Sequence, residues 1–374
     1  MANTYFDNAA TSYPKPPAVA SYISRYINEI GGTYGRGAYR RIIESSSALE
    51  TVRELLAKIL GTGNAENVLF TQNATHAINT VLFGLNLHDC HVLISPLEHN
   101  AVMRPLHEIS QRNNVTYEVL SHGPDGLIEV DKISRQIRTD TKLLIVNHQS
   151  NVNGLIQPVK EIKASAGSIP VLLDLAQSVG HSTISLDTWG IDFAAFTGHK
   201  GLLGPTGTGG VYIRQASAVN TFIFGGTGSR SESFEMPFGV PDKFEAGTPN
   251  IAGIYGLWGA LENPPDHGHE FSDFIDFIRE VDKIKNITLF RSKDISRQGE
   301  LFSIKHHKYD SGYLADLLYS KFGIEIRSGL HCAPLAHKTL GSFPTGTVRF
   351  SVSPYHTIDD FTFLLKALET VSIL

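Results

Sequence analysis

The stretch Asp192-Phe193-Ala194-Ala195-Phe196-Thr197-Gly198-His199-Lys200-Gly201 joins an apolar run to a turn of small residues that carries Lys200. The apolar run is typical of a buried strand. A lysine at the end of such a strand can form a Schiff base, because burial lowers its pKa and small neighbours leave room for a flat ring. Taken alone, Lys200 fits a solvated surface loop at least as well. The choice between the two depends on residues elsewhere in the chain.

The composition is that of an ordinary globular protein. The 374 residues are 41% hydrophobic and 18% charged, and the formal net charge is -5. So mild a charge predicts no nucleic-acid partner and no anionic-membrane surface. No apolar stretch approaches the roughly 18 residues that span a bilayer, and the N-terminus has neither the basic nor the apolar region of a signal peptide. We therefore expect a cytoplasmic protein without a membrane partner.

Cysteine occurs at Cys90 and Cys332 only, which excludes a disulfide framework and suits a reducing compartment. The histidine pairs His306-His307 and His267-Gly268-His269 have no cysteine or carboxylate at ligand spacing. We therefore expect no metal site.

Strand and helix patterns alternate from about residue 45 to residue 260. Several runs are apolar at every position, which is typical of strands that are covered on both faces. This alternation predicts an α/β layer with a mostly parallel, seven-stranded sheet. The expected strands are residues 68–71, 91–95, 116–120, 143–147, 171–174, 193–197 and 210–213, and the expected helices are residues 47–60, 75–85, 101–113 and 159–166.

The pattern changes at Pro264-Pro265-Asp266-His267-Gly268-His269, which has the composition of a linker. Beyond it we expect a small α+β domain whose last helix begins at the capping box Thr357-Ile358-Asp359-Asp360. The predicted domains are residues 31–262 (large) and 263–374 (small), with residues 1–30 packed on the small domain. Within the small domain the expected helices are residues 271–283 and 312–322, and the expected strands are residues 287–290, 301–306, 324–327 and 347–353.

Asp174 ends the apolar run Val171-Leu172-Leu173-Asp174. Ligands of parallel sheets bind at the carboxyl ends of strands, where both Asp174 and Lys200 fall. A buried carboxylate is costly unless it meets a cation, and the protonated ring nitrogen of pyridoxal 5'-phosphate (PLP) is such a cation. A cap at the start of a following helix explains Asp174 equally well.

Polar side chains follow three other strands. In Thr71-Gln72-Asn73-Ala74-Thr75-His76, a helix start offers free N–H groups to a phosphate, although Asn73 or Thr75 could simply be a cap. His99 could stack on a flat cofactor, or be structural. Asn151 could bind the cofactor or a carboxylate, or belong to an Asn-Gly-rich turn.

Cys332 lies in Ile326-Arg327-Ser328-Gly329-Leu330-His331-Cys332-Ala333-Pro334, between a strand and a proline-containing segment. Arg327 and His331 could stabilise a thiolate there. A buried, inert cysteine is the usual alternative, and Cys90 fits it because Cys90 leads directly into a core strand.

Together these residues resemble the class V, fold type I PLP enzymes, and specifically the cysteine desulfurase family. The resemblance runs from Tyr5-Phe6-Asp7-Asn8-Ala9-Ala10 almost to the C-terminus. Gly198-His199-Lys200 resembles the PLP-lysine motif. Phe244-Glu245-Ala246-Gly247-Thr248-Pro249-Asn250 resembles the segment whose threonine reaches the phosphate of the partner subunit's PLP. The Cys332 segment resembles the group II active-site loop.

The resemblance implies a PLP-dependent transferase fold, PLP as the cofactor, a homodimer and a role for each matching residue. Lys200, Cys332 and His99 would be catalytic, with PLP on Lys200 and the nucleophile on Cys332. The other implied roles are Asp174 at the pyridine nitrogen, Gln177 at the ring hydroxyl, His99 stacked on the ring, Thr75, His76, Thr197, His199 and Thr248 at the phosphate (Thr248 across the dimer), and Asn151, Arg349 and Arg327 at the substrate.

The implied reaction converts L-cysteine to L-alanine and leaves a persulfide on Cys332 for a sulfur-acceptor protein. Lys200 would remove the Cα proton, and Cys332 would attack the substrate sulfur. The alternatives are a selenocysteine lyase acting on L-selenocysteine, another class V PLP lyase, epimerase or aminotransferase in which Cys332 is not the nucleophile, and a scaffold without PLP. Two departures from the family stand out: Arg36-Gly37-Ala38-Tyr39 replaces Arg-Gly-x-His, and residues 262–285 are short.

Overall fold

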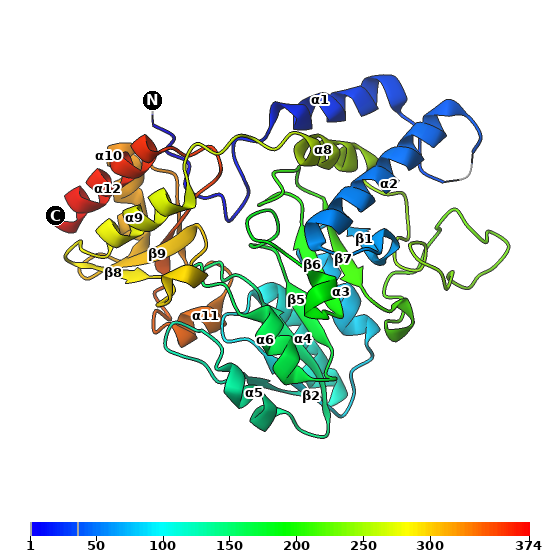
Figure 1. The fold of residues 1–374 in the computed structure, drawn as a ribbon, viewed down its shortest axis with the longest axis horizontal. Helices are drawn as coiled ribbons and strands as arrows, with labels where there is room; N and C mark the ends of the chain where they lie inside the picture. Colours follow the sequence, from blue (N-terminus) through cyan, green and yellow to red (C-terminus); the bar gives the residue numbers. More distant parts are fainter. Residues whose placement is uncertain (1, 36) are drawn as a thin grey trace.

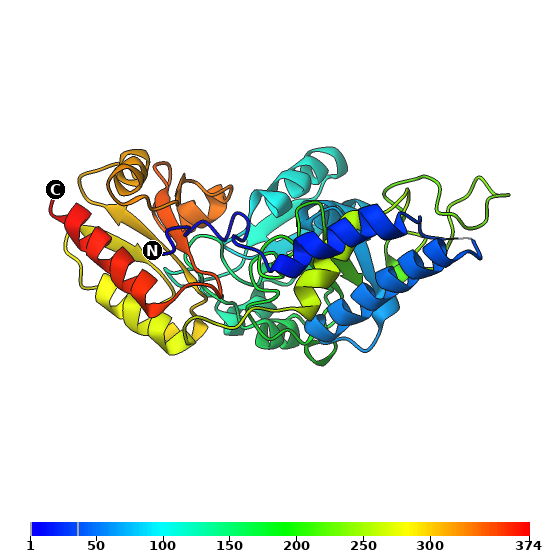
Figure 2. The ribbon, with the colours of Figure 1, turned by 90° about the horizontal axis from the view of Figure 1, so that it is seen from above.

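Two β-sheets organise the chain and lie toward opposite ends of the molecule (Figure 1). The computed structural model describes residues 2–35 and 37–374, so Met1 and Arg36, which opens the Arg36–Tyr39 departure, lie outside the described residues. Figure 2 shows the N-terminal segment running from the side of the smaller sheet to helix α1 (Pro17–Arg25), which lies over the part of the molecule that contains the larger sheet. Within the described ranges, no helix has both the length and the apolar character needed to cross a bilayer.

The larger sheet has the strand order β1-β7-β6-β5-β4-β2-β3. Neighbours from β3 to β6 pair in parallel, and β7 is antiparallel to both β1 and β6. This arrangement confirms the predicted seven-stranded, mostly parallel sheet. Its strands are β1 (Val68–Thr71), β2 (His91–Ile94), β3 (Thr116–Val119), β4 (Thr141–Asn147), β5 (Val171–Asp174), β6 (Phe193–Thr197) and β7 (Gly209–Ile213).

Helices cover both faces of this sheet, which explains why its strands are apolar throughout. In β4, Leu143 and Ile145 pack into the core under α3 and α4, whereas Leu144 and Val146 pack into the core under α2, α5, α6 and α8. The helices of this part are α2 (Arg40–Leu60), α3 (Ala74–Gly84), α4 (Asn100–Asn113), α5 (Val130–Gln136), α6 (Val159–Ala166), α7 (Leu186–Trp189) and α8 (Ile251–Glu262).

The smaller sheet is antiparallel, in the order β10-β11-β9-β8, and helices pack on it around a separate core rich in phenylalanine. Helix α12 begins with the predicted capping box, in which Thr357 and Asp360 each accept a backbone N–H. The elements are β8 (Ile287–Phe290), β9 (Leu301–His306), β10 (Arg327–Gly329), β11 (Thr347–Ser351), α9 (Phe271–Val281), α10 (Ser311–Phe322), α11 (Pro334–Thr339) and α12 (Ile358–Ser372).

The strand expected at residues 324–327 is displaced: β10 begins at Arg327. The reason is a different partner, because the backbone of Glu325 pairs with Thr4 and Phe6 of the N-terminal segment rather than with β11.

The N-terminal segment divides between the two parts of the molecule. Tyr5 and Asp7 form bridges to Glu325 and Ser351 beside the smaller sheet. Helix α1 (Pro17–Arg25) instead packs on α8, where Gly259 permits the approach because an added Cβ would collide with Ala18 O. The expectation that residues 1–30 all pack on the small domain is therefore corrected for α1.

Candidate active site

The carboxyl ends of β4, β5 and β6 meet at a cavity of about 90 Å³. Eight of the residues predicted to form the site line it, although they come from five separate stretches of sequence. They are Thr75, His99, Asn151, Asp174, Gln177, Thr197, His199 and Lys200.

Lys200 and Asp174 influence each other's protonation. Burial lowers the pKa of Lys200 to about 8, Asp174 raises it, and Arg349 and Arg327 lower it further. The Asp174 side chain is buried, which raises its pKa, and Lys200 opposes that rise. Asp174 Oδ1 accepts from Ala176 N at 2.9 Å, within a turn rather than at the start of a helix. The helix-cap alternative for Asp174 therefore does not apply, and the residue lies at the cavity.

His99 is the N-cap of α4, where its Nδ1 accepts from Ala101 N at 3.0 Å. Burial, with Lys200 nearby, lowers the pKa of His99 to about 4. The ring is therefore neutral near pH 7. Because Nδ1 is an acceptor, the proton of the neutral ring lies on Nε2.

The start of α3 lies on another side of the cavity. Asn73 is its cap, since Asn73 Oδ1 accepts from His76 N at 2.9 Å, and Thr75 follows in the first turn. The unpaired N–H groups and positive end of an 11-residue helix suit an anion. Thr197 donates to Thr208 O, and burial lowers the pKa of His199 to about 4.

Three polar atoms of the cavity lining have no hydrogen-bond partner among the described residues: Asn147 Oδ1, Asn151 Oδ1 and His199 Nδ1. All three are buried. Buried polar groups in folded proteins are nearly always paired. Their presence around Lys200 therefore indicates that this cavity is built for a polar ligand.

His76 and Thr248 do not line the Lys200 cavity. Both line a neighbouring cavity of about 360 Å³. The segment that carries Thr248 is held by a buried ion pair, in which Arg53 Nη1 lies 2.8 Å from Glu245 Oε1. The carboxylate also accepts from Phe70 N on β1, the strand that leads to α3.

The loop of Cys332, between β10 and α11, is docked against Asn151, which lines the Lys200 cavity. Cys332 is exposed, and both His331 and Cys332 adopt positive φ (47° and 55°), a conformation that is uncommon outside glycine. Cys332 O accepts from Asn100 N, and His331 O accepts from Asn151 Nδ2, each at 2.8 Å. Backbone contacts thus fix the loop while leaving the thiol accessible.

His331, one of the two residues that could stabilise a thiolate, supplies no positive charge to the thiol. Its Nε2 bonds Thr347 Oγ1 at 3.0 Å, and burial together with Arg349 lowers its pKa to about 2. Cys90, by contrast, is buried next to β2 as expected, and burial raises the pKa of its thiol.

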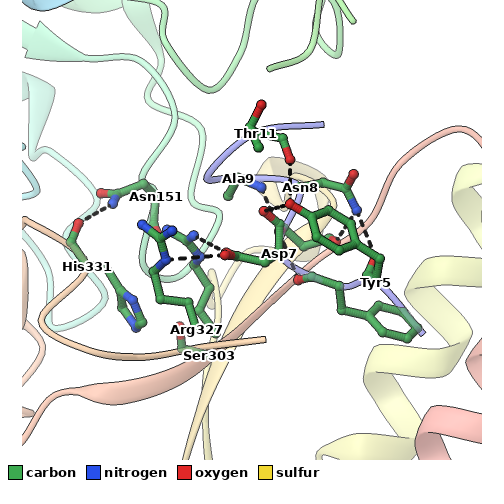
Figure 3. A network of polar contacts seen from close by, with 12 residues as sticks. Tyr5, Asp7, Asn8, Ala9, Thr11, Asn151, Ser303, Arg327 and His331 are labelled. Atoms are coloured by element: carbon green, nitrogen blue, oxygen red, sulfur yellow. Dashed lines mark hydrogen bonds and ion pairs between the residues drawn. The ribbon is translucent and has the colours of Figure 1, made fainter. Parts of the chain in front are cut away.

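Arg327 and Arg349 meet a residue that the sequence did not identify. Asp7 lies 2.8 Å from Arg349 Nη2 and 3.2 Å from Arg327 Nε (Figure 3). An acidic residue directly after Tyr5-Phe6 was the available signal, but its partners lie more than 300 residues away. Asn147 was also missed, although its position at the end of an apolar strand is the same signal that identified Asp174.

Residues 4–364 match the model of the class-V aminotransferase family. A probable cysteine desulfurase of Methanothermobacter thermautotrophicus is 32% identical, with 99% of this chain and 95% of that protein covered. A cysteine desulfurase of Serratia proteamaculans is 31% identical, with coverage of 98% and 93%.

Solved structures give the same result. The apo structure of a cysteine desulfurase from Thermococcus onnurineus superposes with a TM-score of 0.88 at 26% identity, covering 99% of this chain and 94% of that one. A cysteine desulfurase from Escherichia coli, with an S-sulfonic acid, gives 0.86 at 26% identity, with coverage of 99% and 95%. The chain belongs to the class-V aminotransferase family and, within it, to the cysteine desulfurases.

Proposed function

We propose that this chain converts L-cysteine to L-alanine, with PLP held at Lys200 and the sulfur taken by Cys332. One observation carries the proposal. A docked, exposed thiol from the smaller domain adjoins a cavity in which a lysine of lowered pKa lies near a buried carboxylate and three unpartnered polar atoms.

The lining residues fit PLP. Asp174 would meet the ring nitrogen, since a buried carboxylate favours a cation beside it. His99 would stack on the ring and Gln177 would contact its hydroxyl, while Thr75, Thr197 and His199 would hold the phosphate at the start of α3. When bound, PLP supplies an electron-withdrawing ring that stabilises negative charge at the substrate Cα.

Lys200 is suited to move the Cα proton of the substrate. A general base works best when its pKa lies near the working pH, and burial gives Lys200 a pKa of about 8. An appreciable fraction of the amine is then uncharged near neutral pH. The neutral His99 and His199 add no cation that would lower this pKa further.

Cys332 takes the sulfur. Its thiolate attacks the substrate sulfur, so an S–S bond forms on Cys332 while the Cβ–S bond of the substrate breaks. The electron pair of the broken bond stays with the carbon skeleton, which is protonated to alanine, and the sulfur remains as a persulfide. Cysteine is a strong nucleophile for this step, and exposure of Cys332 allows a sulfur-acceptor protein to reach it.

Arg349, Arg327 and Asn151 would bind the substrate carboxylate. Arg349 is 2% exposed and its Nε has no partner among the described residues, so a buried donor is left for an anion. Asn151 adjoins it, because Arg349 Nη1 donates to Asn151 O at 3.3 Å.

A homodimer and a reducing compartment complete the proposal. Thr248 lines a cavity apart from Lys200, which suits a residue that reaches a partner subunit's phosphate. His76 lines the same cavity but follows Thr75 at the start of α3, where it would contact the phosphate together with Thr75. The exposed thiol of Cys332 must stay reduced between turnovers, which favours the cytoplasm.

The test is the release of alanine and sulfide from L-cysteine by the purified holoenzyme with a thiol reductant, compared with L-selenocysteine. We expect alanine from both substrates, and a Cys332→Ala variant that fails with L-cysteine but keeps part of its activity on L-selenocysteine. Undiminished alanine formation from L-cysteine by Cys332→Ala would contradict the nucleophile assignment. Activity on L-selenocysteine alone would identify a selenocysteine lyase instead.

A further inference from the structure

One carboxylate serves both arginines of the substrate site. Arg327 on β10 and Arg349 on β11 are directly opposite each other in the antiparallel ladder. Like charges in this position destabilise a strand pair. Asp7 contacts both, Arg349 at 2.8 Å through Oδ1 and Arg327 at 3.2 Å through Oδ2 (Figure 3). The N-terminal segment therefore supplies the negative charge that compensates the repulsion between the two neighbouring guanidinium groups.

Arg349 depends on this contact more than Arg327 does. Its side chain is 2% exposed, whereas that of Arg327 is 48% exposed. Burial lowers the pKa of Arg349, and Asp7 counteracts this. Asp7 holds Nη2 and Asn151 O holds Nη1, so the guanidinium is fixed by two of its nitrogens. The third, Nε, is a buried donor that has no partner within residues 2–35 and 37–374.

The backbone keeps Asp7 in place. Asp7 bridges to Ser351 on β11, and its neighbours continue the contact: Asn8 Nδ2 donates to Ser351 O at 3.1 Å and Ala9 N donates to Ser351 Oγ at 2.7 Å. Further along, Thr11 Oγ1, Ser12 N, Ser12 Oγ and Lys15 Nζ all donate to the carbonyl of His199, the residue before Lys200. These contacts fix the backbone that carries the carboxylate, and the carboxylate itself is held by Arg349 and Arg327.

We propose that Asp7 is a positioning residue for substrate recognition. It orients Arg349 and balances its charge, so that the free Nε faces the α-carboxylate of the amino-acid substrate. Asp7 stays bound during turnover and is not displaced by the substrate. This inference rests on the proposed function, in which Arg349 binds that carboxylate.

The test compares ligands with and without a carboxylate. Binding of L-cysteine and of cysteamine, which lacks the carboxylate, is measured from the change in cofactor absorbance of the holoenzyme in a Cys332→Ala background. In Asp7→Asn we expect L-cysteine affinity to fall roughly 10- to 100-fold, the range for a lost hydrogen bond between charged groups. Cysteamine affinity should stay within about threefold, because it makes no use of Arg349.

Matched variants separate positioning from a structural role. Asp140→Asn alters another Asp–Arg pair, with Arg138 on the surface, and should change neither affinity. Asp7→Glu keeps the charge on a longer stem and should recover part of the L-cysteine affinity, which also provides a second variant if Asp7→Asn folds poorly. Equal losses for both ligands in Asp7→Asn would mean a structural role only, and tighter L-cysteine binding would mean that Asp7 competes with the substrate. Either result overturns the inference.

Arg349→Lys, measured in parallel, distinguishes a failure of the inference about Asp7 from a failure of the proposed carboxylate site at Arg349. If Arg349→Lys weakens L-cysteine selectively and Asp7→Asn does not, the inference about Asp7 fails and the substrate assignment stands. If Arg349→Lys affects both ligands equally, the carboxylate site of the proposed function is itself wrong.

Discussion

The two halves of the active site are built differently. Lys200, Asp174 and Asn147 lie at the ends of neighbouring strands of one sheet, so the register of β4, β5 and β6 places them. Cys332 lies in a loop with positive φ, whose backbone carbonyls accept from Asn100 N and from the side chain of Asn151. The cofactor side is fixed by the core of the larger sheet, whereas the thiol side is fixed by a few hydrogen bonds to residues outside the smaller sheet.

This difference suits the two tasks. A cofactor needs a rigid site that burial and preorganised dipoles tune, and the Lys200 cavity has these properties. A thiol that accepts sulfur at one place and delivers it at another needs exposure, and Cys332 has it. If the cofactor side and the thiol side are held independently, variants on the cofactor side will change cofactor binding and activity, whereas variants on the thiol side will change activity but not cofactor binding.

The largest effect is expected for Lys200→Ala. Loss of the residue that carries the cofactor and moves the Cα proton should lower kcat at least about 1,000-fold, within the range for acid–base groups. The cofactor absorbance should change as well. Steady-state alanine formation and the absorption spectrum check both, with Lys132→Ala on the surface as the control. Activity near the wild-type level would show that another lysine does this work.

The second-largest effect is expected for Cys332→Ser, which removes the thiol and should leave cofactor binding at Lys200 unchanged. We expect alanine formation from L-cysteine to fall by about 100-fold or more, with cofactor content and its affinity unchanged. Cys90→Ser, in the buried position, is the matched control. If cofactor affinity fell together with activity, the two halves would not be separable.

The protonation of Lys200 gives a pH dependence on the cofactor side alone. Because the amine reacts in its neutral form and its pKa is about 8, PLP binding to the apoenzyme should accelerate about tenfold between pH 7 and pH 9. Asp174 raises that pKa, so Asp174→Asn should move the midpoint to lower pH. Stopped-flow absorbance measures the rate of PLP binding against pH for the wild-type protein and for Asp174→Asn. If the pH at half of the maximal rate is the same in both, the influence of Asp174 on the pKa of Lys200 is contradicted.

The smallest effect is expected on the thiol side, for Thr347→Val. It removes the hydroxyl that bonds His331 Nε2 and should lower kcat a few-fold, with stability reduced by about 1 kcal/mol. Cofactor affinity should not change. Thr288→Val removes a similar bond to His307 at the edge of the same sheet and serves as the control. An effect on kcat from Thr288→Val alone would mean that the loop is not held as described.

The sequence anticipated the cofactor side better for a physical reason. Strand ends can be recognised from local patterns, and parallel strands bring their carboxyl ends together, so Asp174 and Lys200 could be placed in one cavity. The Asp7–Arg349 pair joins residues 342 positions apart, and no local pattern reveals it. The shift of β10 and the packing of α1 on α8 likewise depend on tertiary partners. The low pKa of His331 also depends on its burial and on Arg349 nearby, which the local sequence does not reveal.

The most direct measurement locates the sulfur after one turnover. Holoenzyme is mixed with substoichiometric L-cysteine without reductant, quenched and digested, and the peptides are analysed by mass spectrometry alongside the alanine formed. We predict one additional sulfur atom on the peptide that contains Cys332, in proportion to the alanine, and none on the peptide that contains Cys90. Alanine formed in equal amount without added sulfur on Cys332 would contradict the assignment of the two halves.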